Sequence, residues 1–225
     1  MMVGMADSLF DGKSFFGYPL WNTINRFVIN THFNSATILG MEHLPAGEPF
    51  ILISNHTSRF DGLVVQYLLN RRANYMVSPN EMKGLQRAAV MSVGAFPANP
   101  RLDLVGYSTK QLLSGEPVVV FPEGNVFYDG ETRRFKTGTA KIALEALENG
   151  MNLPVVPLGI QYLKGPRFVA SIGEPLRVGD LVAPGEKRES IKRLTDAFHD
   201  SVLEMVDLAK SVGANPSAGL IATPV

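Results

Sequence analysis

The sequence predicts an α/β fold in which a mixed central sheet has helices on both faces and follows an N-terminal amphipathic helical segment. Short apolar runs alternate with stretches of helical periodicity along most of the chain, while the first 33 residues carry a separate stripe rich in aromatic residues. The 225 residues suffice for one domain that buries its own core. We therefore expect a helical segment over 1–33, one α/β domain over 34–212 and a flexible tail over 213–225.

The N-terminal segment places apolar residues at helical spacing within residues 15–31. The stripe consists of Leu20, Trp21, Ile24, Phe27 and Val28. Aromatic residues on such a face favour the headgroup layer of a membrane, so this helix is a candidate for membrane contact. Packing against the main domain is an equally supported alternative, and each interpretation can hold for a part of the stripe.

The main domain shows the alternation of strands and helices that an α/β sheet requires. The predicted strands cover residues 36–39, 50–54, 75–78, 118–121, 155–160 and 168–172. Helices are predicted over 61–70, 81–91, 104–114 and 137–149, followed by a last amphipathic helix marked by Ile191, Leu194, Phe198, Val202 and Met205. This order favours a sheet covered on both faces, and the small residues that follow favour a disordered tail.

Composition narrows the range of functions. The chain has 21 basic and 21 acidic residues, so no overall field attracts nucleic acid, and an anionic substrate needs a local cluster of cations. The chain has no cysteine, which excludes disulfides, thiolate nucleophiles and cysteine-bound metals and suits a reducing compartment. We see no secretory signal and no window near the ~18 to 20 apolar residues of a spanning helix. We expect no metal, and a peripheral position on the cytoplasmic face of a membrane if the substrate is a lipid.

A histidine and an aspartate flank the turn after the second predicted strand, in the run FILISNHTSRFD over residues 50–61. Ligands of open α/β sheets gather at the carboxyl ends of strands, where His56 falls. An imidazole can take a proton from a hydroxyl, and a carboxylate on its other nitrogen fixes the tautomer and stabilises the imidazolium. His56 and Asp61 are therefore a candidate base and its orienting partner. A helix-capping histidine beside a surface aspartate is the simpler alternative.

Four segments in order resemble the motifs of the glycerolipid acyltransferase family, whose best-known members are the lysophosphatidate (1-acyl-sn-glycerol-3-phosphate) acyltransferases. The segments are NHTSRFD at 55–61, GAFPANPR at 94–101, FPEGN at 121–125 and VVPLG at 155–159. A further match, FKTG at 135–138, follows the third motif as it does in the family. The resemblance spans about residues 36–175 and implies the mixed α/β fold of that family.

The resemblance also implies an O-acyltransferase that moves a fatty acyl group from acyl-CoA or acyl-acyl-carrier protein to the hydroxyl of a lysophospholipid. The leading acceptor is 1-acylglycerol-3-phosphate, which would give phosphatidate. His56 would deprotonate this hydroxyl, and Asp61 would orient His56. The acceptor site would include Arg101, Glu123 and Gly124, with cations meeting the phosphate. No cofactor is implied beyond the thioester co-substrate, whose thiolate is a good leaving group.

The third motif departs from the family pattern. The family continues with glycine, threonine and arginine, whereas this chain has Gly124, an asparagine and Val126. The missing arginine is a natural phosphate ligand. One explanation is that a cation of the run at 132–136 replaces it, namely Arg133, Arg134 or Lys136, of which we assign Arg134 and Lys136 to the acceptor site. The other is that the acceptor is not a simple lysophosphatidate.

Other functions and simpler roles remain open at this point. An acyl-thioester hydrolase would use the same base on water, and a non-catalytic lipid-binding protein would need no base at all. Transfer to an amino-lipid or sugar-lipid hydroxyl is a variant of the leading hypothesis. Arg101 also fits a surface loop and Gly124 a turn, while Pro157 and Gly159 are interpreted as structural.

Overall fold

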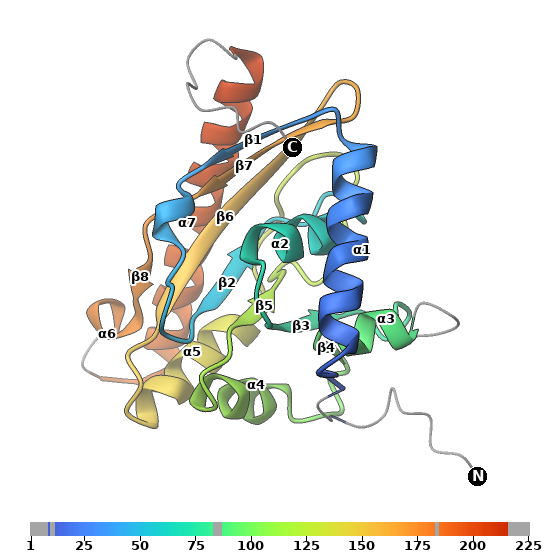
Figure 1. Cartoon of the computed structure of the whole chain (residues 1–225). Coiled ribbons are helices and arrows are strands. Elements are labelled where there is room, and N and C mark those ends of the chain that lie inside the picture. Colours follow the sequence, from blue (N-terminus) through green and yellow to red (C-terminus); the bar gives the residue numbers. More distant parts are fainter. Residues whose placement is uncertain (1–8, 10–11, 83–86, 183–184, 216–225) are drawn as a thin grey trace.

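The computed structural model describes residues 9, 12–82, 87–182 and 185–215 and shows an eight-stranded mixed sheet with the order β1-β7-β6-β2-β5-β3-β4, with β8 also paired to β6 (Figure 1). The strands are β1 (Ser35–Leu39), β2 (Ile51–Ser54), β3 (Asn74–Val77), β4 (Ala95–Pro97), β5 (Val118–Val120), β6 (Pro154–Leu163), β7 (Arg167–Ile172) and β8 (Leu176–Arg177). The helices are α1 (Gly17–His32), η2 (Met41–His43), α2 (Asp61–Leu69), α3 (Arg87–Ser92), α4 (Leu104–Leu113), α5 (Gly138–Glu148), α6 (Val178–Leu181) and α7 (Lys187–Ala214).

The strand directions bring the predicted motifs to one edge of the sheet. Strand β2 pairs in parallel with β5 and β6, and β3 pairs in parallel with β5 and β4. Strands β7 and β8 run antiparallel to β6, and β1 runs parallel to β7. Because the carboxyl ends of parallel strands meet at the same edge, the residues after β2, β5, β3 and β4 lie along that edge in this spatial order.

The sheet separates two apolar cores. Around β2, Phe50 and Leu52 belong to the core that also contains Ile29 of α1 and the apolar side chains of α2. Ile51 and Ile53 point the other way, into the core shared with α5 and α7. This alternation is the period-two pattern of a strand buried on both faces. Helices therefore cover both faces of the sheet, as the sequence predicts.

The six predicted strands are present with small shifts at their ends, but shorter elements are missing from the prediction. Strand β4 has three residues and ends in Pro97, which fits a sheet edge because proline has no N–H to donate.

The predicted helix over 81–91 is wrong at its start. Glu81 and Met82 lie in a turn closed by bonds to the carbonyls of Ser78 and Pro79, and α3 begins at Arg87. Residues 83–86 lie outside the described part of the chain.

The last helix extends beyond the predicted end of the domain at residue 212. Helix α7 continues to Ala214, and its Ala209 and Val212 pack with Val169 of β7, with Leu163 beside them. These contacts hold the end of α7 against the sheet. Residues 216–225 are not among the described residues, so the flexible tail predicted there stays a prediction.

Helix α1 divides the predicted stripe between the domain and the surface. Tyr18, Asn25 and Ile29 are buried, and the Asn25 amide donates a 3.0 Å hydrogen bond to the Leu63 carbonyl of α2. On the other side lies the exposed α1 face, which we define as Leu20, Ile24 and Phe27 of the helix together with Phe15 and Phe16 directly before it. Trp21 and Val28 are partly buried between the two sides. None of the described helices is both long and apolar enough to cross a bilayer.

Candidate active site

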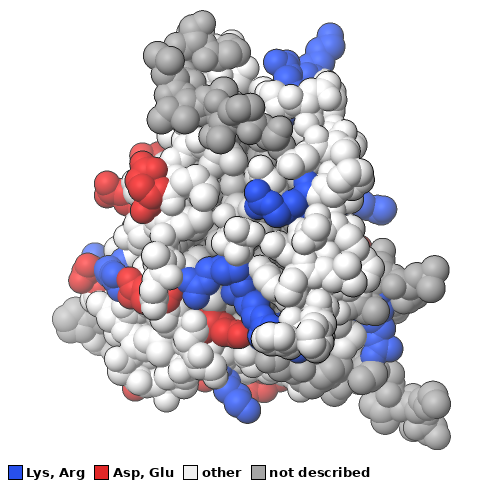
Figure 2. Space-filling view, viewed as in Figure 1, with Lys and Arg blue, Asp and Glu red and all other residues white. Residues whose placement is uncertain are grey.

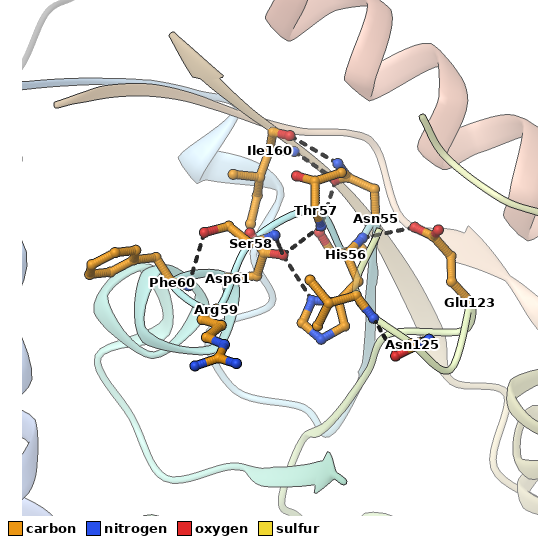
Figure 3. Close-up of polar contacts among 12 residues, drawn as sticks. Asn55, His56, Thr57, Ser58, Arg59, Phe60, Asp61, Glu123, Asn125 and Ile160 are labelled. Atoms are coloured by element: carbon orange, nitrogen blue, oxygen red, sulfur yellow. Dashed lines mark hydrogen bonds and ion pairs between the residues drawn. The ribbon is translucent and has the colours of Figure 1, made fainter. Parts of the chain in front are cut away.

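The turn between β2 and α2 holds His56 against Asp61. The distance from His56 Nδ1 to Asp61 Oδ2 is 2.8 Å, and Asp61 is completely buried at the start of α2 (Figure 3). An ionised carboxylate only accepts hydrogen bonds, so Nδ1 carries the hydrogen of this bond and Nε2 remains to take a proton. The side chain of His56 is 20% exposed, which leaves the ring within reach of a substrate. The predicted base and its orienting partner are therefore in contact.

Asp61 receives more hydrogen bonds than the one from His56. The backbone N–H groups of Thr57 and Ser58 each donate to Oδ2 at 2.8 Å, and the Tyr162 hydroxyl donates to Oδ1 at 2.8 Å. Burial of a charged carboxylate is costly unless such donors surround it. The turn thus wraps its own backbone around the carboxylate, and the spacing of five residues between histidine and aspartate is what allows this.

Neighbouring strands hold the turn from two sides. The amide of Asn55 pairs with the backbone of Ile160 on β6, donating to its carbonyl at 2.9 Å and accepting from its N–H at 2.8 Å. On the β5 side, the His56 ring stacks on Phe121 with a centroid distance of 4.3 Å and an interplanar angle of 19°. Because β6 and β5 flank β2 in the sheet, these contacts fix the imidazole from both directions.

Glu123 joins the turn to the loop that follows β5. Glu123 is 3% exposed, and its carboxylate accepts the His56 N–H at 2.8 Å (Figure 3). It also accepts the Arg133 N–H at 2.9 Å. Burial raises the pKa of Glu123, and these two backbone hydrogen bonds oppose that rise. The Phe127 N–H also donates to the His56 carbonyl at 2.8 Å. Glu123 thus lies beside His56 with both carboxylate oxygens engaged by backbone groups, and its role in binding the acceptor stays a prediction.

Gly124 and Lys136 lie against each other beside Glu123. Gly124 has a φ of 72°, and a Cβ at this position would collide with the Lys136 side chain, which crosses over it. Glycine therefore satisfies both the left-handed backbone and the close approach of the lysine. Lys136 is exposed, and its backbone N–H is bonded to the Pro122 carbonyl at 2.9 Å. The structure therefore brings a cation next to the third motif, where the family's arginine is missing.

The two predicted arginines have less contact with this site. Arg101 is exposed in the turn after β4, which lies three strands from β2, or about 14 Å along the sheet edge. Arg134 is exposed, and neither arginine forms an ion pair with another described residue. The structure therefore joins His56, Asp61 and Glu123 directly and leaves both arginines without a contact to them.

Two residues of the site were not predicted from the sequence. Tyr162 reaches Asp61 from β6. Arg59 is exposed within the turn, and its Nε donates to the Tyr128 hydroxyl at 3.1 Å. Figure 3 shows the Arg59 guanidinium and the His56 imidazole directed to the same side of the turn, away from Ile160. Arg59 could have been noticed as a cation inside the first motif, whereas Tyr162 requires knowledge that β6 lies next to β2.

Comparisons with known proteins identify a protein family and similar sequences. The protein-family model described as Acyltransferase matches residues 35–161. Tafazzin of Drosophila melanogaster is 22% identical to the chain, with 82% of this chain and 61% of that protein covered. The 1-acyl-sn-glycerol-3-phosphate acyltransferase alpha of Bos taurus is 26% identical, with 74% of this chain and 61% of that protein covered. The chain thus spans less than two thirds of the length of these relatives.

A solved structure shares the fold. The 1-acyl-sn-glycerophosphate acyltransferase of Thermotoga maritima superposes with a TM-score of 0.67, with 86% of this chain and 80% of that chain covered at 18% sequence identity. The mixed sheet with helices on both faces is therefore a fold that this chain shares with that structure.

Proposed function

This chain belongs to the acyltransferase family, and from that premise we propose that it moves a fatty acyl group from an acyl thioester to the hydroxyl of a lysophospholipid. The resemblance of its motifs to the glycerolipid acyltransferases agrees with the bovine relative and with the fold of the Thermotoga maritima enzyme. The observation that carries the proposal is the 2.8 Å bond between His56 Nδ1 and the buried Asp61 carboxylate. This arrangement suits a reaction in which the substrate brings its own nucleophilic hydroxyl.

In the proposed reaction, Nε2 of His56 removes the proton of the acceptor hydroxyl as its oxygen attacks the thioester carbonyl. The carbon–sulfur bond of the tetrahedral intermediate then breaks, and the thiolate leaves with the proton that the imidazolium returns. The Asp61 carboxylate stabilises the imidazolium between these steps. The donor is acyl-CoA or acyl-acyl-carrier protein, and no further cofactor takes part.

The leading acceptor is 1-acylglycerol-3-phosphate, the substrate class in the bovine relative's name. Its phosphate is attached to the carbon next to the one that bears the hydroxyl, so a cation near His56 is needed. Lys136, beside Gly124, and Arg59, within the turn, are the cations that the contacts favour. Arg101 and Arg134 remain further candidates. Val126 supports the second candidate function, which is transfer to a lipid acceptor without this phosphate.

The exposed α1 face supports a peripheral position on a membrane. Phe16, Leu20 and Phe27 are 81%, 57% and 68% exposed, and residues 12–41 contain no aspartate or glutamate to repel an anionic surface. Figure 2 shows few charged side chains over the part of this view that α1 forms in Figure 1. We propose that this face enters the interfacial layer of the bilayer, and that the bilayer surface is the cytoplasmic one.

The test is to incubate the protein with labelled acyl-CoA, or with acyl-acyl-carrier protein, and a panel of acceptors. The panel contains lysophosphatidate, lysophosphatidylcholine, monoacylglycerol and a blank, and the lipid products are separated. We expect label in phosphatidate, and no label when His56 is replaced by alanine. Release of free fatty acid at one rate with and without acceptor would instead identify a hydrolase.

A further inference from the structure

The second oxygen of Asp61 is held by a residue outside the motifs. Three donors share Oδ2, namely the His56 ring and the N–H groups of Thr57 and Ser58. Among the described residues, Oδ1 accepts a hydrogen bond from Tyr162 Oη alone, at 2.8 Å. Tyr162 lies near the end of β6, one residue past the segment that the family model matches.

The environment of Tyr162 keeps its hydroxyl protonated, so that it donates a hydrogen bond. Burial, and next the negative charge of Asp61, raise the pKa of Tyr162 above its usual range, so the hydroxyl keeps its proton. The ring is fixed by Phe33 and Phe168, whose centroids lie 6.0 Å and 6.4 Å from its own. A phenol held in this way directs its O–H at one carboxylate oxygen and cannot easily turn elsewhere.

The bond has a consequence for the His56–Asp61 pair. A carboxylate fixed at Oδ1 cannot rotate about its Cβ–Cγ bond, so Oδ2 stays directed at Nδ1 of the imidazole. Loss of the phenol would leave a fully buried, charged oxygen without a partner. The negative charge would then be less stabilised, and the pair would bind a proton more readily.

We propose that Tyr162 is a positioning residue that holds Asp61 in the orientation in which it directs and polarises His56. This inference rests on the proposed function, because Tyr162 acts through the His56–Asp61 pair and touches no substrate. Its effect therefore appears in the rate of the chemical step and in the protonation of the pair, and not in substrate binding.

The kinetic test compares wild type with Tyr162→Phe, which removes only the hydroxyl. We expect kcat to fall roughly ten- to a hundredfold, the value of one charge-assisted hydrogen bond, with the KM values for both substrates unchanged. The acidic limb of the pH–rate profile should move to higher pH. In an Asp61→Asn background, Tyr162→Phe should cause no further loss, because both changes act on the same carboxylate. The matched control is Tyr67→Phe, a partly buried tyrosine of α2 that should keep the wild-type rate.

A second readout does not depend on acyl transfer. The ring of His56 is titrated by NMR in wild type and in Tyr162→Phe, and we expect the midpoint to move to higher pH in the variant. Unchanged titration and unchanged kcat in a folded Tyr162→Phe protein would overturn the proposal, and so would losses that multiply in the Asp61→Asn background. If wild type transfers no acyl group to any acceptor, the proposed function is refuted. A His56 midpoint that still differs between wild type and Tyr162→Phe would then leave the role of Tyr162 standing.

Discussion

Glu123 accepts a 2.8 Å hydrogen bond from the backbone N–H of His56, so the third motif holds the first through its carboxylate. The other oxygen of Glu123 accepts the N–H of Arg133 at 2.9 Å. A buried carboxylate between two backbone donors is a structural bridge between two loops. The bridge gives Glu123 a structural role that requires no contact with a substrate.

We predict that Glu123→Gln lowers the free energy of unfolding by about 1 to 3 kcal/mol, since the amide can accept only one of the two N–H groups and presents its own donors to the other. Activity should fall with it, because the bond to the His56 N–H helps to set the turn. Chemical denaturation and the acyl-transfer rate are the measurements. Glu131→Gln, an exposed change in the same loop, is the control and should alter neither. Wild-type stability in Glu123→Gln would show that the bridge is dispensable.

His56→Ala is expected to reduce acyl transfer by about 10² to 10⁴-fold or more while the protein stays folded. Asp61→Asn should also be severe, because an amide can hold the ring but cannot stabilise its charge. Circular dichroism checks the fold, and labelled product measures the rate. His199→Ala, on α7, is the control for loss of an imidazole elsewhere. If a folded His56→Ala protein keeps more than about a tenth of the wild-type rate, His56 is not the base.

The cation that replaces the missing motif arginine can be found by separate alanine substitutions of Arg59, Arg101, Arg134 and Lys136. A true phosphate ligand provides a charge-assisted bond of about 1.5 to 3 kcal/mol, so its loss should raise the KM for lysophosphatidate roughly ten- to a hundredfold. The KM for acyl-CoA should change little. We expect the largest effects at Arg59 and Lys136, which lie beside the turn and the third motif.

Monoacylglycerol serves as the matched acceptor in that experiment, because it lacks the phosphate. Its use should be insensitive to all four substitutions. Unchanged constants for lysophosphatidate in every variant, at the wild-type rate, would mean that the natural acceptor lacks that phosphate. A rise confined to the KM for acyl-CoA would place the cation in the donor site instead.

The double substitution Leu20→Ser with Phe27→Ser should reduce binding to phospholipid vesicles at least about a hundredfold, since burial of each such side chain is worth about 1.5 to 3 kcal/mol. Both side chains are more than half exposed, so the melting temperature should hardly change. Co-sedimentation with vesicles is the measurement. Leu208→Ser, on α7, removes an exposed leucine outside α1 and should leave binding unchanged. Equal loss in this control would mean that the exposed α1 face has no special role.

The sequence predicts those strands and helices that have a pattern of apolar residues of their own. The strands of the core are apolar runs, and the helices carry a periodic face, so the α/β sheet could be predicted. Strands β4 and β8 have three and two residues, too few for any periodicity, and they are stabilised by neighbours that only the fold supplies. The structural role that the sequence predicts for Gly159 agrees with the packing, because a Cβ at this position would collide with the backbone of α7 at Met205.

In the site as well, contacts within one short segment can be predicted from the sequence, and contacts between distant segments cannot. His56 and Asp61 are joined through one short turn, so their spacing in the sequence already indicates a contact. Tyr162 meets Asp61 across a separation that no local pattern records, because it depends on the order of β6 and β2 in the sheet. Glu123 could be predicted as a site residue from its motif, but its bonds to backbone N–H groups could not.

The pairing of β1 with β7 bears on how the chain assembles. Ser35 is three residues beyond the end of α1, and it pairs with Arg167, so the first strand can join the sheet only after every strand but β8 has been synthesised. Closing so long a loop is slow in comparison with forming the β6–β7 hairpin. Refolding from denaturant should therefore be limited by this late addition at the sheet edge. Until then α1 is held to the domain only by its own contacts, such as the bond from Asn25 to Leu63 of α2, and not by the strand that follows it.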